Sequence, residues 1–229
     1  MDFLTLVGEV HRESGSGGTA PTTLTGLRGE NERLKNWTAR AYLEIQEKFS
    51  DWKFLWNQHS MAITAGTALY NPLLAGGLSL SPNSNIGEYD RDTFFIGTDK
   101  LEVVDYLDVK SIAAPTTAGA PWQAVIMPDD GLRIDPIPDA DATLTFDYWS
   151  TPVGLTNDDD EPVIPLRFHQ AIIGKALIFY ANYENAPEIR QTGEEMYMEW
   201  MQKLEADQLP GDRYQHVKAE GGNMVIEVE

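Results

Sequence analysis

The sequence predicts an α+β protein in which a bundle of N- and C-terminal helices carries an inserted antiparallel β domain, with extended termini. Apolar residues recur at helical spacing over residues 28–49 and again over residues 166–206. Between these stretches, short β-branched and aromatic runs alternate with Gly, Pro, Asn and Asp. This order of elements predicts that the β region, a sandwich or a small barrel, interrupts the helical bundle.

The N-terminal part is expected to hold a short helix and then the first long one. Residues 1–27 are interpreted as a flexible arm, whose short helix over residues 3–12 ends at the glycine-rich residues 14–18. The long helix follows over residues 28–49. Its apolar residues are spaced by three or four and share one face, namely Leu34, Trp37, Ala41 and Ile45.

A dense aromatic segment comes directly after this helix. Phe49, Trp52, Phe54, Leu55 and Trp56 lie within a few residues of one another, and so much aromatic area must be buried against distant parts of the chain. Trp52, Phe54 and Trp56 are therefore predicted to form a structural junction that holds the helical and β parts in a fixed relation. The expected domains are a bundle of residues 28–55 and 162–206, and an insertion of residues 56–161.

The β region is expected to hold several short strands. The last run, residues 142–149, alternates polar with apolar side chains, which is typical of a half-buried strand. Residues 128–131, Pro-Asp-Asp-Gly, predict a turn. Residues 152–165, which include three consecutive aspartates, are interpreted as a solvated acidic loop.

Two helices and a tail are expected after this loop. Residues 166–185 are apolar on most sides, so this helix is enclosed by its own domain or by a neighbouring subunit. Pro187 is expected to begin the last helix, which runs to about residue 206. The tail, residues 207–229, finishes with an alternating segment that is either a frayed end or a strand pairing with an edge on another protein. Its suspected partner-binding residues are Met224, Val225, Ile226 and Val228.

Charge and composition restrict the function classes. The formal net charge is −19, from 36 acidic and 17 basic residues, which argues against affinity for nucleic acid. The charge suits a soluble surface or an acidic wall beside which DNA slides without sticking. No cysteine is present, no signal peptide is evident, and no run of about 20 apolar residues occurs. We therefore expect a protein of cytoplasmic origin that is not bound to a membrane.

No motif for catalysis, metal binding or cofactor binding is found, so we expect no enzyme site, metal or cofactor. The histidines are scattered singly, and His169, on the enclosed helix, suits a hydrogen-bonded structural role better than a catalytic one. Two alternatives stay open. An Asp/Glu pair would serve a cell-wall polysaccharide hydrolase. Trp56, Trp122 and Trp149 would serve a carbohydrate-binding tail module, although packing in the core is their default role.

The layout resembles a known family, the head-to-tail adaptor (connector) proteins of short-tailed bacteriophages, of the tail tubular protein A type. The resemblance rests on Ala41, Glu44, Ile45 and Gln46 in a helix that ends in residues 51–54, Asp-Trp-Lys-Phe. A β region follows. Residues 165–172 then open a helix rich in Ala, Tyr and Phe, and residues 187–188, Pro-Glu, open the last helix.

The resemblance implies a structural virion protein without catalytic activity. Such adaptors form a ring, typically of about twelve subunits, below the portal and join the capsid to the tail. The implied partners are other copies of the chain, the portal protein and a tail nozzle or tail tube protein. Double-stranded DNA would pass through the ring without specific binding during genome packaging and ejection. The implied location is the head-tail interface of the virion, after synthesis in the cytoplasm of the host bacterium.

Overall fold

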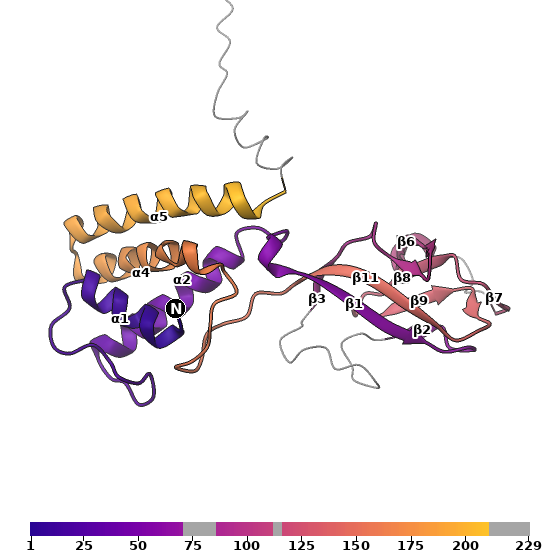
Figure 1. Cartoon of the computed structure of the whole chain (residues 1–229), viewed down its shortest axis with the longest axis horizontal. Helices are drawn as coiled ribbons and strands as arrows, with labels where there is room; N and C mark the ends of the chain where they lie inside the picture. Colours follow the sequence, from indigo (N-terminus) through magenta and orange to yellow (C-terminus); the bar gives the residue numbers. More distant parts are fainter. Residues whose placement is uncertain (71–85, 112–115, 211–229) are drawn as a thin grey trace, which may run out of the picture. The chain divides into compact units, whose positions relative to one another are not determined.

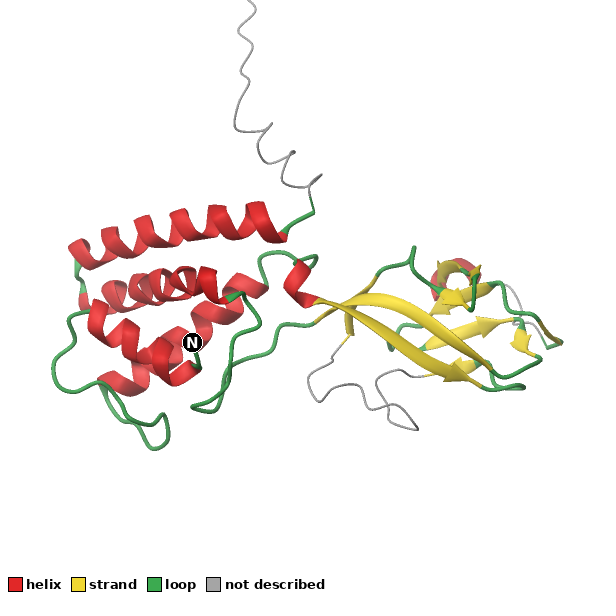
Figure 2. Ribbon diagram, viewed as in Figure 1, coloured by secondary structure: helices red, strands yellow, loops and turns green. Residues whose placement is uncertain are grey.

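A computed structural model describes residues 1–70, 86–111 and 116–210 of the chain (Figure 1). The chain divides into two compact units. The helical unit comprises Met1–Phe54 and Pro152–Glu229, and the β unit comprises Leu55–Thr151. Figure 2 shows helices at both ends of the chain and strands between them, which confirms the predicted α+β class with its inserted β region.

The helical unit is built around α4 (His169–Glu184), which follows a short 3-10 helix (Leu166–Phe168). Helices α1 (Phe3–Glu13), α2 (Glu30–Gln46) and α5 (Pro187–Gln208) all pack against α4. The apolar helix expected at residues 166–185 is therefore enclosed by its own unit. A second short 3-10 helix (Lys53–Leu55) follows α2.

Helices α4 and α5 approach closely because each carries a glycine where they meet. A Cβ atom on Gly174 would lie 2.7 Å from the Tyr197 backbone nitrogen, and one on Gly193 would lie 2.9 Å from the Gly174 carbonyl oxygen. Real Cβ atoms do not approach backbone atoms so closely. Glycine at these two positions therefore sets the distance between the two helix backbones.

Helix α1 belongs to the packed core of the helical unit. Its apolar side chains Phe3, Leu6, Val7 and Val10 are buried, and the helix packs against α2 and α4. The expectation of a flexible arm is therefore wrong for this segment. The four side chains share the face that the sequence predicted, and burial of that face fixes the helix in place.

The acidic loop is solvent-exposed at Asn157, Asp159 and Glu161, as the sequence predicted, and its backbone also forms hydrogen bonds with α1. The backbone N–H groups of Phe3 and Leu4 donate to the carbonyl oxygens of Asp160 (2.9 Å) and Asp158 (3.1 Å). The Asp158 carboxylate accepts a hydrogen bond of 2.9 Å from the Leu24 N–H. Helix N-termini carry N–H groups without helical partners, and this loop satisfies two of them.

The β unit holds two larger sheets and one small one. The first has the strand order β1 (Trp56–Ile63), β11 (Ala142–Ser150), β4 (Phe95–Ile96) and β5 (Asp99–Lys100), and β3 (Ile86–Tyr89) also pairs with β11. The second has the order β2 (Leu69–Tyr70), β9 (Leu132–Asp135), β8 (Gln123–Ile126) and β6 (Glu102–Asp105), and the short helix α3 (Tyr106–Val109) follows β6. The small sheet pairs β7 (Ala118–Gly119) with β10 (Ile137–Pro138).

Both larger sheets contribute to one hydrophobic core, the arrangement of a sandwich. Met61 and Phe146 enter it from the first sheet, and Leu132 and Ile134 enter it from the second. Most pairs are antiparallel, as the sequence predicted, but β6 pairs with β8 and β7 pairs with β10 in parallel. Strand β11 buries alternate residues from Leu144 onward, and this confirms the half-buried alternation over residues 142–149.

Among the residues that the structure describes, no helix combines the length and the apolar character that a membrane span requires.

Candidate interaction surface

Two of the buried histidines, His169 and His59, contact groups of their own units. The Nε2 atom of His169 lies 2.8 Å from the Ile164 carbonyl oxygen, to which it donates as the Nε2–H tautomer. Burial lowers the pKa of His169, and the same effect lowers the pKa of His59, whose ring lies 5.2 Å from that of Phe146. A lowered pKa keeps both rings neutral at neutral pH. Within the described ranges, no three His, Cys, Asp or Glu side chains are grouped to hold a metal ion.

Among the residues that the structure describes, Asp2, Glu44 and Asp160 have lowered pKa values. The pKa of Asp2 is lowered by hydrogen bonds from Thr5, and that of Asp160 by the backbone N–H groups of Asn157 and Thr156. For Glu44, partial burial acts to raise the pKa, but hydrogen bonds from Lys175 and Arg40 outweigh that effect. The proton donor of a glycoside hydrolase needs a raised pKa. These three carboxyl groups are therefore unsuited to that role.

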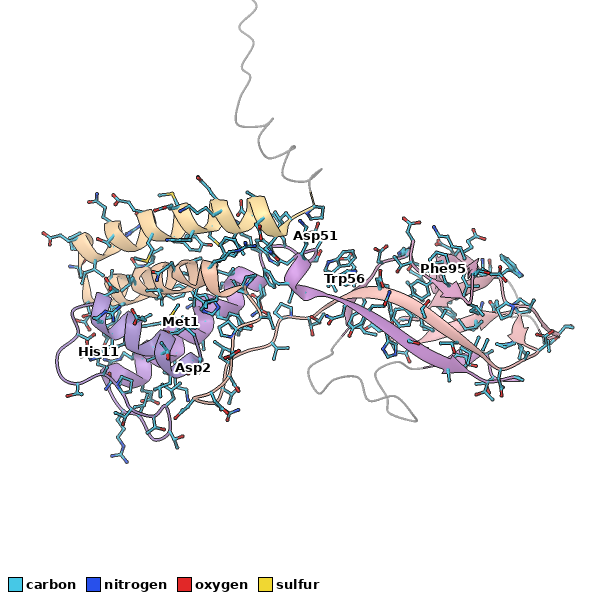
Figure 3. The ribbon with its side chains drawn as sticks, in the orientation of Figure 1. Met1, Asp2, His11, Asp51, Trp56 and Phe95 are labelled. Atoms are coloured by element: carbon cyan, nitrogen blue, oxygen red, sulfur yellow. The ribbon has the colours of Figure 1, made fainter. Side chains whose placement is uncertain are left out.

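The residues predicted to form a structural junction lie in both units. In the helical unit, Trp52 is fully buried, its indole N–H donates to the Ile45 carbonyl (3.2 Å), and its ring stacks on that of Phe54. Trp56 is the first residue of β1 in the β unit, where it pairs with Trp149 and is 45% exposed (Figure 3). That the three residues fix the relation between the units stays a prediction.

Trp122 is also exposed (56%), so core packing was the wrong default for Trp56 and Trp122. The suspected partner-binding residues of the tail, Met224, Val225, Ile226 and Val228, lie outside the described residues.

A row of cationic and aromatic side chains follows the contact between α2 and α4. We call it the cation–aromatic stripe, and it consists of Arg33, Trp37 and Arg40 on α2 with Phe179 and Tyr183 on α4. The α2 members are spaced by four and three residues, so they share one helix face. That face also holds Leu34 and Ala41 at its buried side. The stripe is therefore the outer margin of the surface by which α2 packs on α4.

Each arginine of the stripe contacts an aromatic ring on α4, and Trp37 contacts one of these rings. The Arg33 guanidinium lies 4.5 Å from the Tyr183 ring centre, and the Arg40 guanidinium lies 4.6 Å from that of Phe179. Trp37 fills the position between the two arginines, with its ring centre 5.5 Å from that of Tyr183. Cation–π contacts place each guanidinium against a ring, and the Arg40 guanidinium also donates through its Nε–H to Glu44.

A partly buried ion pair anchors one end of the stripe. Glu44 accepts hydrogen bonds from Arg40 (2.8 Å) and forms a 3.0 Å ion pair with Lys175, whose side chain is only 22% exposed. The Lys175 ammonium also lies 5.1 Å from the Tyr197 ring of α5. Arg40 is thus oriented by Glu44 and Phe179 together. This pre-organisation reduces the conformational entropy that binding would cost.

The composition and exposure of the stripe suit protein binding. Tyr183 is 54% exposed and the Arg40 side chain is 65% exposed. Arginine, tryptophan and tyrosine dominate the energetic centres of protein interfaces. Two arginines with a single compensating carboxylate, Glu44, stand out in a chain of net charge −19. The stripe is therefore suited to an acidic protein surface. The sequence pattern predicts a buried face for Trp37 and gives no sign that the flanking arginines form a surface with α4, although their helical spacing is visible.

Helix α5 offers an acidic surface on the same unit. It carries six acidic and two basic residues, and few of its side chains are buried. The two basic residues, Arg190 and Lys203, are already paired with Glu194 (2.7 Å) and Glu199 (2.5 Å) on the same helix. Glu188 and Glu195 are exposed as well. The helical unit therefore presents a cationic surface and an acidic surface.

A comparison with protein families gives a match across most of the chain. The model of a family described as SU10 adaptor protein matches residues 1–221. No curated protein matches the chain significantly. The family match extends across both units and over every element described above.

Proposed function

The chain belongs to the SU10 adaptor protein family, and from this premise we propose that its copies form a ring between the portal and the tail of a bacteriophage virion. Membership makes the chain a structural head-to-tail adaptor of a phage, as the sequence resemblance predicted. The finer assignment to the tail tubular protein A type stays a prediction. The match over residues 1–221 is the observation that carries the proposal, because it includes the helical unit and the β unit together.

An adaptor of this family interacts with portal and tail proteins in the virion. We propose that its role is purely structural, since the lowered carboxyl pKa values and the neutral rings of His59 and His169 give no support to a hydrolase. A carbohydrate-binding module likewise receives no support from the family match.

Ring contacts between copies are proposed to join two different surfaces. A closed ring needs a head-to-tail interface, in which one patch of a subunit meets a different patch of the next. The cation–aromatic stripe and the acidic outer face of α5 are complementary in charge. In this proposal Arg33 and Arg40 of one copy face the carboxylates of α5 on its neighbour, which would guide association and fix the register.

The proposed passage of DNA follows from the net charge. A ring of such chains repels phosphate, because each contributes a formal charge of −19. Repulsion prevents adhesion of the genome to the wall of the channel, so DNA moves through without specific binding. About twelve subunits is the expected size of the ring.

Electron microscopy of the protein mixed with the portal protein of the same phage tests the proposal. Ring-shaped particles with the adaptor attached to the portal are expected. The double variant Arg33→Glu and Arg40→Glu should reduce assembly at least tenfold, because each change places a carboxylate opposite the acidic face. Lys110→Glu in the β unit, an exposed position outside the stripe, serves as the charge control. Absence of any complex between the unmodified chain and the portal would refute the adaptor ring.

A further inference from the structure

Strand β1 is a long edge strand without a second partner in the described part of the chain. All eight of its residues, Trp56–Ile63, pair with β11, and the strand order places β1 at one end of its sheet. In an antiparallel pair, alternate residues direct their N–H and C=O groups away from the partner strand. Across residues 1–70, 86–111 and 116–210, no backbone hydrogen bond reaches this outer side of β1.

Strand β1 lacks the features by which sheet edges discourage pairing with another chain. It has no proline, no lysine and no acidic residue, and its pairing with β11 shows no bulge. The opposite edge of the same sheet is β5, which has two residues, both charged. A long, uncharged and regular edge is the geometry to which an added strand binds. This edge is therefore suited to be covered in the assembled protein.

The C-terminal segment of the chain has the sequence that such an edge requires. Residues 223–229, Asn-Met-Val-Ile-Glu-Val-Glu, alternate apolar and acidic residues toward their end, are rich in β-branched residues and contain neither glycine nor proline. They match β1 closely in length. Added to the edge, Met224, Ile226 and Val228 would extend the buried row of His59, Met61 and Ile63.

We propose that residues 223–229 of one copy add to the free edge of β1 in the neighbouring copy. The inference rests on the proposed ring. Each chain then has one donor segment and one acceptor edge, a head-to-tail relation that a closed ring satisfies in every copy. Strand β5 of a neighbour is too short to occupy the edge. Residues 209–222 separate the segment from the end of α5 at Gln208, and 14 extended residues span up to about 50 Å.

Hydrogen exchange on the assembled full-length protein tests the donation. Ile226→Pro removes a backbone donor from the segment, and Ala219→Pro introduces proline outside it. In oligomers of the unmodified chain and of Ala219→Pro, the outward amides of β1 should exchange at least about tenfold more slowly than in Ile226→Pro oligomers. Equal exchange of β1 in all three would overturn the proposal.

Cross-linking identifies which copy donates. The chain contains no cysteine, so Ala62→Cys and Val225→Cys can be placed in separate preparations, mixed, assembled and joined with a short bifunctional maleimide. A cross-linked dimer of the two different chains supports donation between copies. A third preparation carries both cysteines in one chain. If a link forms only within that chain, or if the only dimer links position 62 of one copy to position 62 of another, the proposal is overturned.

These outcomes separate the inference from the proposed function. If the unmodified chain binds the portal as a ring but β1 exchange is insensitive to Ile226→Pro, strand donation fails and the adaptor ring stands. If no oligomer forms with or without the portal, the ring itself fails.

Discussion

Gly174 and Gly193 determine the closest approach of backbones in the helical unit. Because each Cβ position is already occupied by atoms of the facing helix, any larger side chain must move α4 and α5 apart. A shift here also moves Tyr197 relative to Lys175, and hence the ion pair with Glu44 that orients Arg40. Two residues without side chains thereby influence the geometry of the cation–aromatic stripe.

Replacement of Gly174 by alanine should destabilise the helical unit by about 1–3 kcal/mol, since overpacking forces backbone displacement. Gly8→Ala is the matched control, because Gly8 lies inside α1 with no atom within 4 Å of its Cβ position. That change should be neutral or stabilise the unit by up to about 1 kcal/mol. Chemical denaturation followed by far-UV circular dichroism measures both. Equal stability of the two variants would contradict the close-packing argument.

Individual residues also show where sequence reasoning reached its limit. Periodicity correctly identified Leu34, Ala41 and Ile45 as buried, because spacing alone determines a helix face. It could not show that Trp56 and Trp122 are exposed, since exposure depends on which strands surround a side chain. The role of the stripe arginines could not be predicted for a related reason. They form a surface only together with aromatic rings on α4, which lie more than 130 residues later in the chain.

At the scale of elements, α1 illustrates how local signals and long-range contacts combine. Asp2 lies at the start of the helix (Figure 3), and its carboxylate accepts a 2.8 Å hydrogen bond from the Thr5 N–H. Two further N–H groups of the first turn are satisfied by the acidic loop. The sequence predicted the helix and its apolar face. It did not predict the docked loop, because backbone contacts between residues about 155 positions apart leave no local pattern.

Asp2→Ala should weaken the docking of α1 by about 0.5–2 kcal/mol, as is usual for loss of an N-cap, whereas Asp2→Asn keeps an acceptor and should cost less. The Thr5 hydrogen bonds lower the pKa of Asp2 below its ordinary value of 3.8. The charge-dependent part of the stabilisation is therefore fully present above pH 3.8 and is lost as the pH falls through the lowered folded pKa.

Hydrogen exchange of α1 amides at neutral pH and near pH 3 measures this effect. The difference between Asp2→Ala and the unmodified chain should shrink at the lower pH. If the difference in exchange between Asp2→Ala and the unmodified chain is the same at both pH values, the charge of Asp2 contributes nothing to the capping.

At the scale of the whole molecule, the described residues of each compact unit form a hydrophobic core. One is enclosed by α1, α2, α4 and α5, and the other lies between the two larger sheets. The sequence order of helices, strands and helices was sufficient to predict the class, because periodicity changes from helical to alternating and back. The sequence order could not predict the strand order or the parallel pairs, because pairing is decided by contacts that the linear pattern does not encode.

Two cores in one chain should unfold as two transitions, because cooperativity follows a shared core. Ile134→Val removes a methyl group from a fully buried side chain of the β unit and should cost about 0.5–1.5 kcal/mol there. Gly174→Ala acts in the helical unit. In differential scanning calorimetry each variant should lower the midpoint of one transition and leave the other within error. If both variants shift one common transition, the two units unfold as a single cooperative body, and a change in either core would be transmitted to the other.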